Sequence, residues 1–203
     1  MKTNIIKLAF FVIAGIFLII FLFDLILMGS FSLRIDSTCH QKEYLITKEN
    51  RIDYQRKLDC AGYSSAYVLR HFGIEAYGKH IYDSMPKMKN GCVYPKHLKN
   101  TLKQNGLNVK YAAGNLKALK NEIAKGNPVI VFIRLKEKSS ELHFVPVVGY
   151  DKENLYLAES VSYLINSGSD FYNRKISNKE FLKLWNTSML KMPFHTHTFF
   201  ITE

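Results

Sequence analysis

The hydrophobic positions divide the chain into two unequal parts. Of the 21 residues from Leu8 to Met28, only Gly15 and Asp24 are not apolar. Because an α-helix rises about 1.5 Å per residue, this run matches the hydrocarbon core of a bilayer. It is also longer than the apolar region of a cleaved signal peptide, which spans about 7–15 residues. We therefore predict an uncleaved transmembrane signal-anchor over residues 1–28, in which Asp24 is a tolerated polar residue that reaches the membrane interface.

The charges beside this segment indicate its orientation only weakly. Lys2 and Lys7 precede the apolar run, whereas Arg34, Lys42 and Lys48 follow it closely. Long domains are translocated largely regardless of their charge. We therefore expect a single-pass protein of the cell membrane that contacts the membrane through residues 8–28, with a cytoplasmic N-terminus and an extracytoplasmic remainder.

The next part of the chain begins with polar residues and continues with helical patterns. Residues 29–50 are mixed and polar, which predicts a linker that ends in a short extended piece, residues 44–47. Asp59 is a favourable N-cap residue, and a helix is expected over residues 60–72. Pro95 is typical of the first position of a helix, which predicts a second helix over residues 95–104. Apolar residues at helical spacing predict a third helix over residues 116–123.

Strand patterns dominate the second half of the chain. The continuous apolar run over residues 128–133, which is rich in β-branched side chains, is typical of a strand buried on both faces. The polar turn 151–154 separates two apolar runs, which predicts a hairpin. A capping box that starts at Ser177 predicts a helix through Trp185. The further predicted strands cover residues 144–150, 155–158 and 196–202. Helices first and strands later indicate an α+β domain over residues 51–203 rather than alternating βαβ units.

The composition is globular and the charge is uneven. The 203 residues are 47% hydrophobic and 22% charged, which excludes collagen-like and wholly disordered chains. The formal net charge is +11, and residues 1–28 contribute only one unit of it, which leaves +10 on residues 29–203. The lysines are spread over several predicted helix faces and match no nucleic-acid-binding motif, so we expect no nucleic-acid partner. An anionic membrane or cell-wall surface is the most economical partner for this charge.

Neither a cofactor nor a metal ion is expected. The sequence contains no nucleotide-binding fingerprint. His195 and His197 alternate along a predicted strand, but no cysteine or acid cluster accompanies them, and a metal site would need such ligands.

A cysteine, a histidine and an acid occur in an order that supports thiol chemistry. Cys60 lies in the first turn of a predicted helix, where unpaired N–H groups and the helix dipole stabilise a thiolate. His143 immediately precedes one strand of the hairpin, and Glu159 ends the other. The hairpin therefore brings His143 and Glu159 to the same end, where a carboxylate can orient an imidazole base for the nucleophile.

The residues around these positions resemble C39-type and C39-like cysteine peptidases. Residues 58–63 (LDCAGY) are similar to the Asp-Cys-Gly stretch that opens the nucleophile helix of that family. Residues 126–131 (GNPVIV) and 142–151 (LHFVPVVGYD) are similar to its G-x-P-V-I-V and H-x-V-V-V-x-G-Y-D block. Glu159 aligns with an aspartate that is normally the third catalytic residue. The resemblance covers residues 51–165 and implies a papain-like fold, a nucleophile helix packed on an antiparallel sheet, with a Cys–His–acid triad.

The resemblance also implies a mechanism that hydrolyses peptide or protein substrates. His143 would take the proton of Cys60, whose thiolate would attack a peptide carbonyl and form a thioester acyl-enzyme. Gln55 and the backbone N–H of Cys60 would donate to the developing oxyanion. Three positions depart from the family pattern. Gln55 lies five residues before the cysteine instead of about six, Ala61 replaces the usual glycine, and Glu159 replaces aspartate.

Other interpretations of these residues stay open. Residues 59–62 (DCAG) also resemble the Asp-Cys-Ser-Gly of NlpC/P60-type cell-wall endopeptidases, although the block around His143 favours the C39-like family. A non-catalytic papain-like binding module would keep the same fold without turnover. Asn166 is an alternative to Glu159 as the orienting residue, and the spacing does not decide whether Cys39 and Cys92 form a disulfide.

Overall fold

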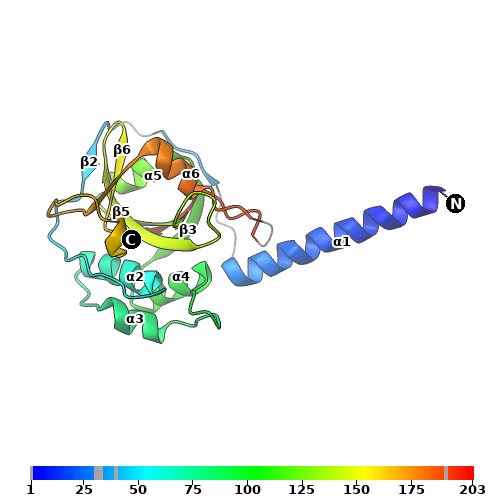
Figure 1. The fold of residues 1–203 in the computed structure, drawn as a ribbon, viewed down its shortest axis with the longest axis horizontal. Helices are drawn as coiled ribbons and strands as arrows, with labels where there is room; N and C mark the ends of the chain where they lie inside the picture. The colour runs from blue at the N-terminus through cyan, green and yellow to red at the C-terminus, as the bar shows by residue number, and fades with distance from the viewer. Residues whose placement is uncertain (1, 30–33, 39–40, 190–191) are drawn as a thin grey trace.

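The structure, a computed structural model, describes residues 2–29, 34–38, 41–189 and 192–203. It consists of a long N-terminal helix, α1 (Lys2–Met28), and a domain in which helices flank a β-sheet. Figure 1 shows that α1 projects away from this domain and meets it only at its C-terminal end. Within α1, the segment Ile5–Ile26 is long enough and apolar enough to cross a membrane.

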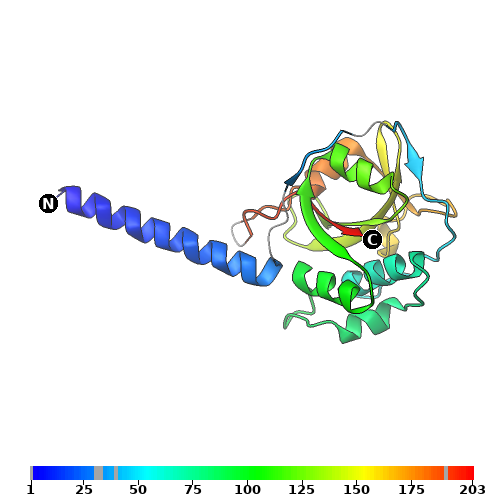
Figure 2. The same ribbon diagram turned by 180° about the vertical axis from the view of Figure 1, so that it is seen from behind.

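The sheet is antiparallel except at one edge, and it curls strongly, as Figure 2 shows. Its strands are β1 (Arg34–Ile35), β2 (Tyr44–Leu45), β3 (Val109–Gly114), β4 (Val129–Arg134), β5 (Leu142–Tyr150), β6 (Asn154–Leu157), β7 (Arg174–Ser177) and β8 (Thr198–Thr202). They are ordered β1-β3-β8-β4-β5-β6-β7, and β2 pairs with β5. The parallel pair is β1 with β3. The long strand β5 therefore contacts β2, β4 and β6.

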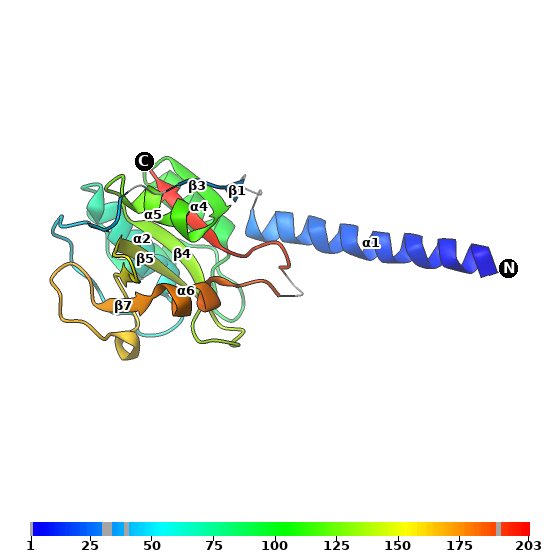
Figure 3. The same ribbon diagram turned by 90° about the horizontal axis from the view of Figure 1, so that it is seen from above.

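Helices cover both faces of the sheet, as Figures 1 and 3 show. They are α2 (Cys60–His71), α3 (Gly78–Ser84) and α4 (Pro95–Gln104) on one side, and α5 (Leu116–Ile123) and α6 (Asn178–Trp185) on the other. Leu69 of α2 and Leu98 of α4 belong to a buried cluster with Phe132 of β4. Ile123 of α5 and Trp185 of α6 belong to a second cluster with other residues of β4 and β5. Both faces of these two strands are therefore buried, which explains their nearly continuous apolar sequences.

The predicted α+β architecture is confirmed, and most predicted elements are found within a few residues of their expected positions. Two local details differ from the prediction. Asp59 occupies the predicted N-cap position of α2, but its carboxylate accepts from the backbone N–H of Lys57 at 3.0 Å and makes no capping hydrogen bond with the helix. The last strand begins at Thr198 and not at residue 196, because the backbone of His197 has a φ of 54° that an extended strand does not allow.

The segment predicted as a linker contributes two short strands to the sheet. Arg34 and Ile35 pair with Ala113 and Gly114 of β3. The expected extended piece near residue 44 is present as β2, in which Tyr44 pairs with Tyr150 of β5. The residues before 51 thus take part in the sheet, although the exact start of an independent domain is still a prediction.

The C-terminal end of α1 packs on the domain, and this changes the interpretation of Asp24. We expected Asp24 to reach a membrane interface, but its side chain is 1% exposed and its Oδ2 lies 3.4 Å from Nε2 of His195. One turn further, Met28 joins the core cluster of α2 and α4. Phe21 lies edge-to-face against Phe194, with 5.9 Å between the ring centroids. One face of the last two turns of α1 is therefore covered by the domain, whereas Phe23 and Ile26 on the other side are 57% and 64% exposed.

Candidate active site

The first turn of α2 carries Cys60 and is packed closely against α3. A Cβ atom on Gly62 would lie 2.4 Å from the carbonyl oxygen of Gly78 and 2.5 Å from Cβ of Tyr82, so no larger residue fits there. The small residue at position 62 therefore allows α3 to approach the first turn of α2 closely. Cys60 itself, the first residue of α2, is partly exposed and carries a free thiol.

A buried hydrogen bond fixes α2 on the strand that carries His143. Ser64 Oγ donates to the carbonyl oxygen of Phe144 at 2.8 Å. Ser64 lies one helical turn after Cys60, and Phe144 directly follows His143. Because residues four apart share a face of a helix, this bond holds Cys60 and His143 in a common register. The serine is therefore the link between the predicted nucleophile and the predicted base.

A β-bulge determines which face of the sheet Glu159 occupies. Gly149 pairs with Tyr156, but Val147 pairs with Leu157, so the register between β5 and β6 shifts by one residue. Beyond β6 the pairing continues, because the N–H of Ala158 donates to the carbonyl oxygen of Pro146 at 3.0 Å. A one-residue shift moves every following side chain to the other face. With the shifted register, Glu159 falls on the same face as His143.

The carboxylate of Glu159 is completely buried and accepts three hydrogen bonds. Its Oε1 accepts from His143 Nε2 at 2.8 Å and from the N–H of Val161 at 2.9 Å. Its Oε2 accepts from Nη1 of Arg174 at 2.8 Å. Sequence reasoning missed Arg174, whose only signal was a basic residue in a short polar segment. The structure thus brings together His143 and Glu159 and adds an arginine to the pair.

The electrostatics of the pair favour its charged form. Burial opposes a charge on His143, but the Glu159 carboxylate and a hydrogen bond with the Cys60 thiol favour the imidazolium more strongly and raise the pKa of His143 to about 10. Burial likewise opposes a charge on Glu159, yet His143, Arg174 and the N–H of Val161 lower the pKa of this carboxyl to about 2. Because Nε2 faces Glu159, the other ring nitrogen, Nδ1, is left for the thiol of Cys60.

Gln55, the predicted oxyanion donor, lies on the segment before α2 and is tied to Ser160. Its backbone N–H donates to the carbonyl oxygen of Ser160 at 2.9 Å, and its Oε1 accepts from Ser160 Oγ at 2.7 Å. Its side-chain amide donates to the carbonyl oxygen of Lys57. Gln55 is therefore anchored beside Glu159 through the neighbouring residue. The alternative orienting residue Asn166 instead pairs with the backbone of Lys175, through its side-chain oxygen and amide group.

The second described cysteine lies close enough to Cys60 to interact with it electrostatically. Burial and the proximity of Cys60 raise the pKa of the Cys92 thiol, and the thiol is free. Cys39, the residue considered as a disulfide partner of Cys92, lies outside the described residues.

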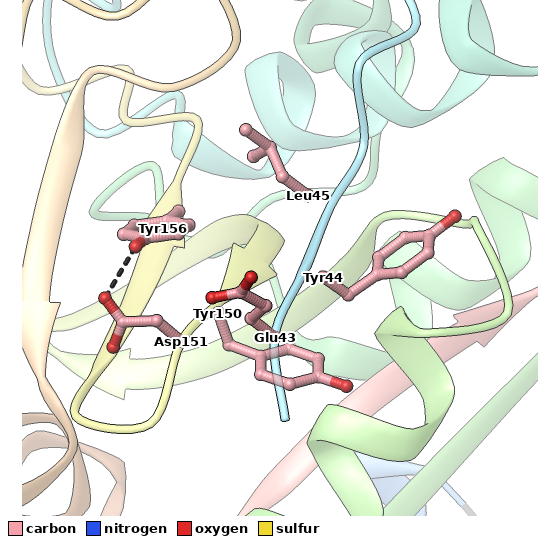
Figure 4. Close-up of a pocket in the computed structure, with 6 residues that line it drawn as sticks. All are labelled: Glu43, Tyr44, Leu45, Tyr150, Asp151 and Tyr156. Atoms are coloured by element: carbon pink, nitrogen blue, oxygen red, sulfur yellow. Dashed lines mark hydrogen bonds between the residues drawn. The ribbon is translucent and has the colours of Figure 1, made fainter. Parts of the chain in front are cut away.

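The domain also contains a pocket that lies away from these residues. Its cavity volume is about 310 Å³, and Figure 4 shows the side chains around it. They are Glu43, Tyr44, Leu45, Tyr150, Asp151 and Tyr156. Tyr150 ends β5, whereas His143 lies near its beginning, so the length of this strand separates the pocket from the His143–Glu159 pair. The pocket is therefore not the place where the thiol and imidazole meet.

A cysteine at the head of a helix, packed on an antiparallel sheet that carries a histidine and an acid, is the arrangement of papain-like cysteine peptidases. The chain belongs to the Peptidase_C39 like family, whose model matches residues 49–189. Membership in this family supports peptidase activity for this chain. No curated protein matches the sequence.

Solved structures of similar fold include three peptidases. One is a C39-like peptidase from Bacillus anthracis, with 16% identity and a TM-score of 0.61, covering 80% of this chain and 98% of that chain. Another is the peptidase domain of Streptococcus ComA, a bifunctional ABC transporter of a quorum-sensing pathway, with 14% identity, a TM-score of 0.59, and coverage of 76% and 97%. A double glycine motif protease from an AMS/PCAT transporter, solved with its leader peptide, has 16% identity, a TM-score of 0.53, and coverage of 78% and 96%. These likenesses show the shared fold.

Proposed function

We propose that this protein is a membrane-anchored thiol peptidase in which Cys60 is the nucleophile, His143 the general base and acid, and Glu159 the residue that orients the imidazole. The observation that carries the proposal is the buried His143–Glu159 contact of 2.8 Å beside a free thiol at the head of α2, in a chain of a peptidase family. The proposed reaction is hydrolysis of a peptide bond.

The proton moves in two directions during the proposed reaction. The raised pKa of His143 favours the proton on the imidazole over the thiol, so that the thiolate of Cys60 is available to attack the scissile carbonyl. Collapse of the tetrahedral intermediate breaks the C–N bond, and the imidazolium donates its proton to the leaving amine. Water then attacks the thioester, His143 accepts a proton from it, and the acid product leaves.

The oxyanion would be held at the start of α2. The first N–H groups of a helix have no intrahelical acceptor, so the N–H of Cys60 can donate to the developing negative charge. The amide group of Gln55 has two N–H bonds, one of which donates to Lys57. We assign the second N–H of Gln55 to the oxyanion. A Gln55→Glu variant would place a negative charge there and is expected to lower kcat more than Gln55→Ala.

The proposed anchor is the segment Ile5–Ile26 of α1. Its apolar side chains are exposed along the helix, as in Ile6, Phe11 and Phe17, which are 68%, 70% and 65% exposed. A soluble protein rarely leaves such a large apolar surface uncovered, and a bilayer would cover it.

We propose an extracytoplasmic domain. Protease added outside intact cells is then expected to digest the domain, and protection of the domain in intact cells would contradict this orientation.

The nucleophile is tested by labelling with a thiol-reactive peptide warhead. The wild type is expected to label rapidly, whereas Cys60→Ala is not expected to label and His143→Ala is expected to label slowly. Cys92→Ala is the matched control, because Cys92 is the other free thiol among the described residues and its pKa is raised. Equal labelling of the wild type and His143→Ala would exclude the dyad and favour a binding module without turnover.

A further inference from the structure

A buried arginine that the proposed mechanism does not use lies beneath the catalytic pair. Arg174, the first residue of β7, is only 5% exposed, and its Nη1 donates to Glu159 Oε2 at 2.8 Å. Arginine is almost never fully buried unless its charge is paired. Its partner here is the carboxylate that accepts from His143. We propose that Arg174 is a positioning residue of this active site, which keeps Glu159 ionised and fixed against the imidazole; the proposal rests on the function proposed above.

The three side chains come from β5, from the segment that directly follows β6, and from β7. Leu157 of β6 pairs with Arg174 of β7 on one side and with Val147 of β5 on the other. Glu159 lies two residues after Leu157 and therefore shares its face, because side chains alternate along an extended chain. The carboxylate is thus held between two strands, with Oε1 directed to His143 and Oε2 directed to Arg174.

The residue before Arg174 holds the backbone of Glu159 in the same way. Asn173 Oδ1 accepts from the N–H of Glu159 at 2.7 Å, and Asn173 Nδ2 donates to its carbonyl oxygen at 2.8 Å. Asn173 is itself buried. Two consecutive residues therefore fix both the backbone and the side chain of Glu159, which leaves its carboxylate little freedom to turn away from His143.

The charge of Arg174 matters because Glu159 is completely buried. A buried carboxyl tends to take up a proton, and a protonated Glu159 would no longer favour the imidazolium. The charged and titratable groups that act on this pair are His143 and Glu159 themselves, Cys60 from α2 and Arg174 from β7. Arg174 supplies the second positive charge beside the carboxylate, and its planar guanidinium is suited to pairing with a carboxylate. Removing it leaves the carboxylate buried beside a single cation.

The first test uses the full-length chain in detergent, with Cys39 and Cys92 replaced by serine. The rate at which iodoacetamide alkylates Cys60 is measured against pH for the wild type, Arg174→Gln, Arg174→Lys and the control Lys175→Gln. We expect Arg174→Gln to slow alkylation at neutral pH by about tenfold, which is the size of effect seen when a group that orients a functional side chain is removed. We also expect the rise of the alkylation rate on the acidic side of the pH profile to move to higher pH. Lys175→Gln removes the charge of the next residue, whose Nζ lies 3.8 Å from Oδ2 of Asp151. This control should change neither the alkylation rate at neutral pH nor the pH profile.

The second test follows the carboxyl group directly and needs no substrate. In a Cys60→Ala background, ¹³C NMR of labelled glutamate side chains reports Glu159, which is assigned with Glu159→Gln. The signal should stay ionised from about pH 7 to about pH 4 in the parent and titrate within this range in Arg174→Gln. An unchanged Glu159 signal together with an unchanged alkylation profile would overturn the proposal.

The outcomes separate this proposal from the proposed function. If the wild type hydrolyses no peptide but Arg174→Gln still brings Glu159 into titration, the peptidase function fails and the positioning role stands. If the wild type hydrolyses peptides and Arg174→Gln keeps its kcat and pH profile, the positioning role alone fails. A true positioning effect lowers kcat and leaves KM within about twofold, because Arg174 does not touch the substrate. If Arg174→Gln does not fold, the Arg174→Lys variant decides. This variant keeps the positive charge but not the planar guanidinium, so it should lower kcat and leave the acidic side of the pH profile unchanged. A wild-type kcat in Arg174→Lys would overturn the proposal.

Discussion

Two buried histidines each lie beside a carboxylate, and they are in opposite protonation states. His143 contacts Glu159 at 2.8 Å, and His195 contacts Asp24 at 3.4 Å. Both imidazoles are 2% exposed. Nevertheless, the pKa of His143 is raised to about 10, whereas burial lowers the pKa of His195 to about 4. At neutral pH the first is therefore an imidazolium and the second a neutral ring.

The difference lies in what surrounds each carboxylate. Glu159 accepts from His143, from Arg174 and from a backbone N–H. Among the described residues, by contrast, neither oxygen of Asp24 has a hydrogen-bond partner. A carboxylate can stabilise a neighbouring imidazolium only when its own charge is stabilised and the contact is short. Burial alone gives a neutral histidine.

The two sites also differ in what they serve. His195 is stacked against Tyr111, whose hydroxyl lies 3.2 Å from its Nδ1, and it packs where the end of α1 meets the domain. This is a structural contact between the proposed anchor and the domain. His143 uses one nitrogen for Glu159 and contacts the thiol of Cys60, so its proton can be exchanged in a reaction. An imidazole beside a carboxylate thus supports packing in one place and, in the proposed mechanism, proton transfer in the other.

The largest expected effect comes from removing each carboxylate charge without changing its shape. Glu159→Gln should lower kcat for peptide hydrolysis by about 10³–10⁴, because His143 loses the group that sets its tautomer and its charge. Asp24→Asn should leave kcat at the wild-type value. Both rates are measured on the full-length protein in detergent. A similar loss in the two variants would mean that the end of α1 is part of the catalytic machinery and would remove the distinction between the pairs.

The dependence of stability on pH should have opposite signs at the two histidines. The folded-state pKa of His195 is lowered, so its contribution to stability is fully present above about pH 6.5 and is lost as the pH falls towards about 4, by on the order of 3 kcal/mol. The folded-state pKa of His143 is raised, so its contribution is present below about pH 6.5 and is lost as the pH rises towards about 10.

Thermal unfolding of His195→Asn between about pH 4 and about pH 7 tests this sign. The destabilisation relative to the wild type should be largest at neutral pH and should shrink as the medium becomes more acidic. His80→Asn is the matched control, since His80 is exposed. A difference between wild type and His195→Asn that does not change with pH would show that His195 is not held neutral.

Part of the proposed site could be predicted from the sequence, and the rest depended on long-range contacts. The thiol at a helix start, the hairpin and the order of Cys60, His143 and Glu159 are local patterns. The shared face of His143 and Glu159 is not, because it requires the bulge between Val147 and Gly149. At Gly149 a Cβ atom would lie 2.8 Å from the carbonyl oxygen of Tyr44, so the close pairing of β2 with β5 depends on this glycine. Periodicity cannot show such a register shift, since it counts residues along one strand only.

The burial of two charged residues, Arg174 and Asp24, also could not be predicted from the local sequence. Neither residue has a sequence neighbour that explains its burial. Arg174 meets its partner across the β6–β7 ladder, and Asp24 meets His195 across a separation of 171 positions. The short elements α3, β3 and β7 were also missed, because their sequences mix polar and apolar residues without a clear period. In each case the tertiary contact, and not the local pattern, decides the structure.

The smallest single effect is expected at Asp24, when each carboxylate is replaced by leucine and the change in the free energy of unfolding is measured. Glu159→Leu strands Arg174 and His143 as buried charges and should cost about 3–5 kcal/mol. Asp24→Leu removes a carboxylate that receives no hydrogen bond from the described residues and places a leucine between Phe21 and Met28. It should change stability by only about 1 kcal/mol in either direction, because losing an unsatisfied polar group offsets the strain of a larger side chain. Equal destabilisation by the two leucine variants would show that the Asp24–His195 contact is an ion pair of the same strength as His143–Glu159.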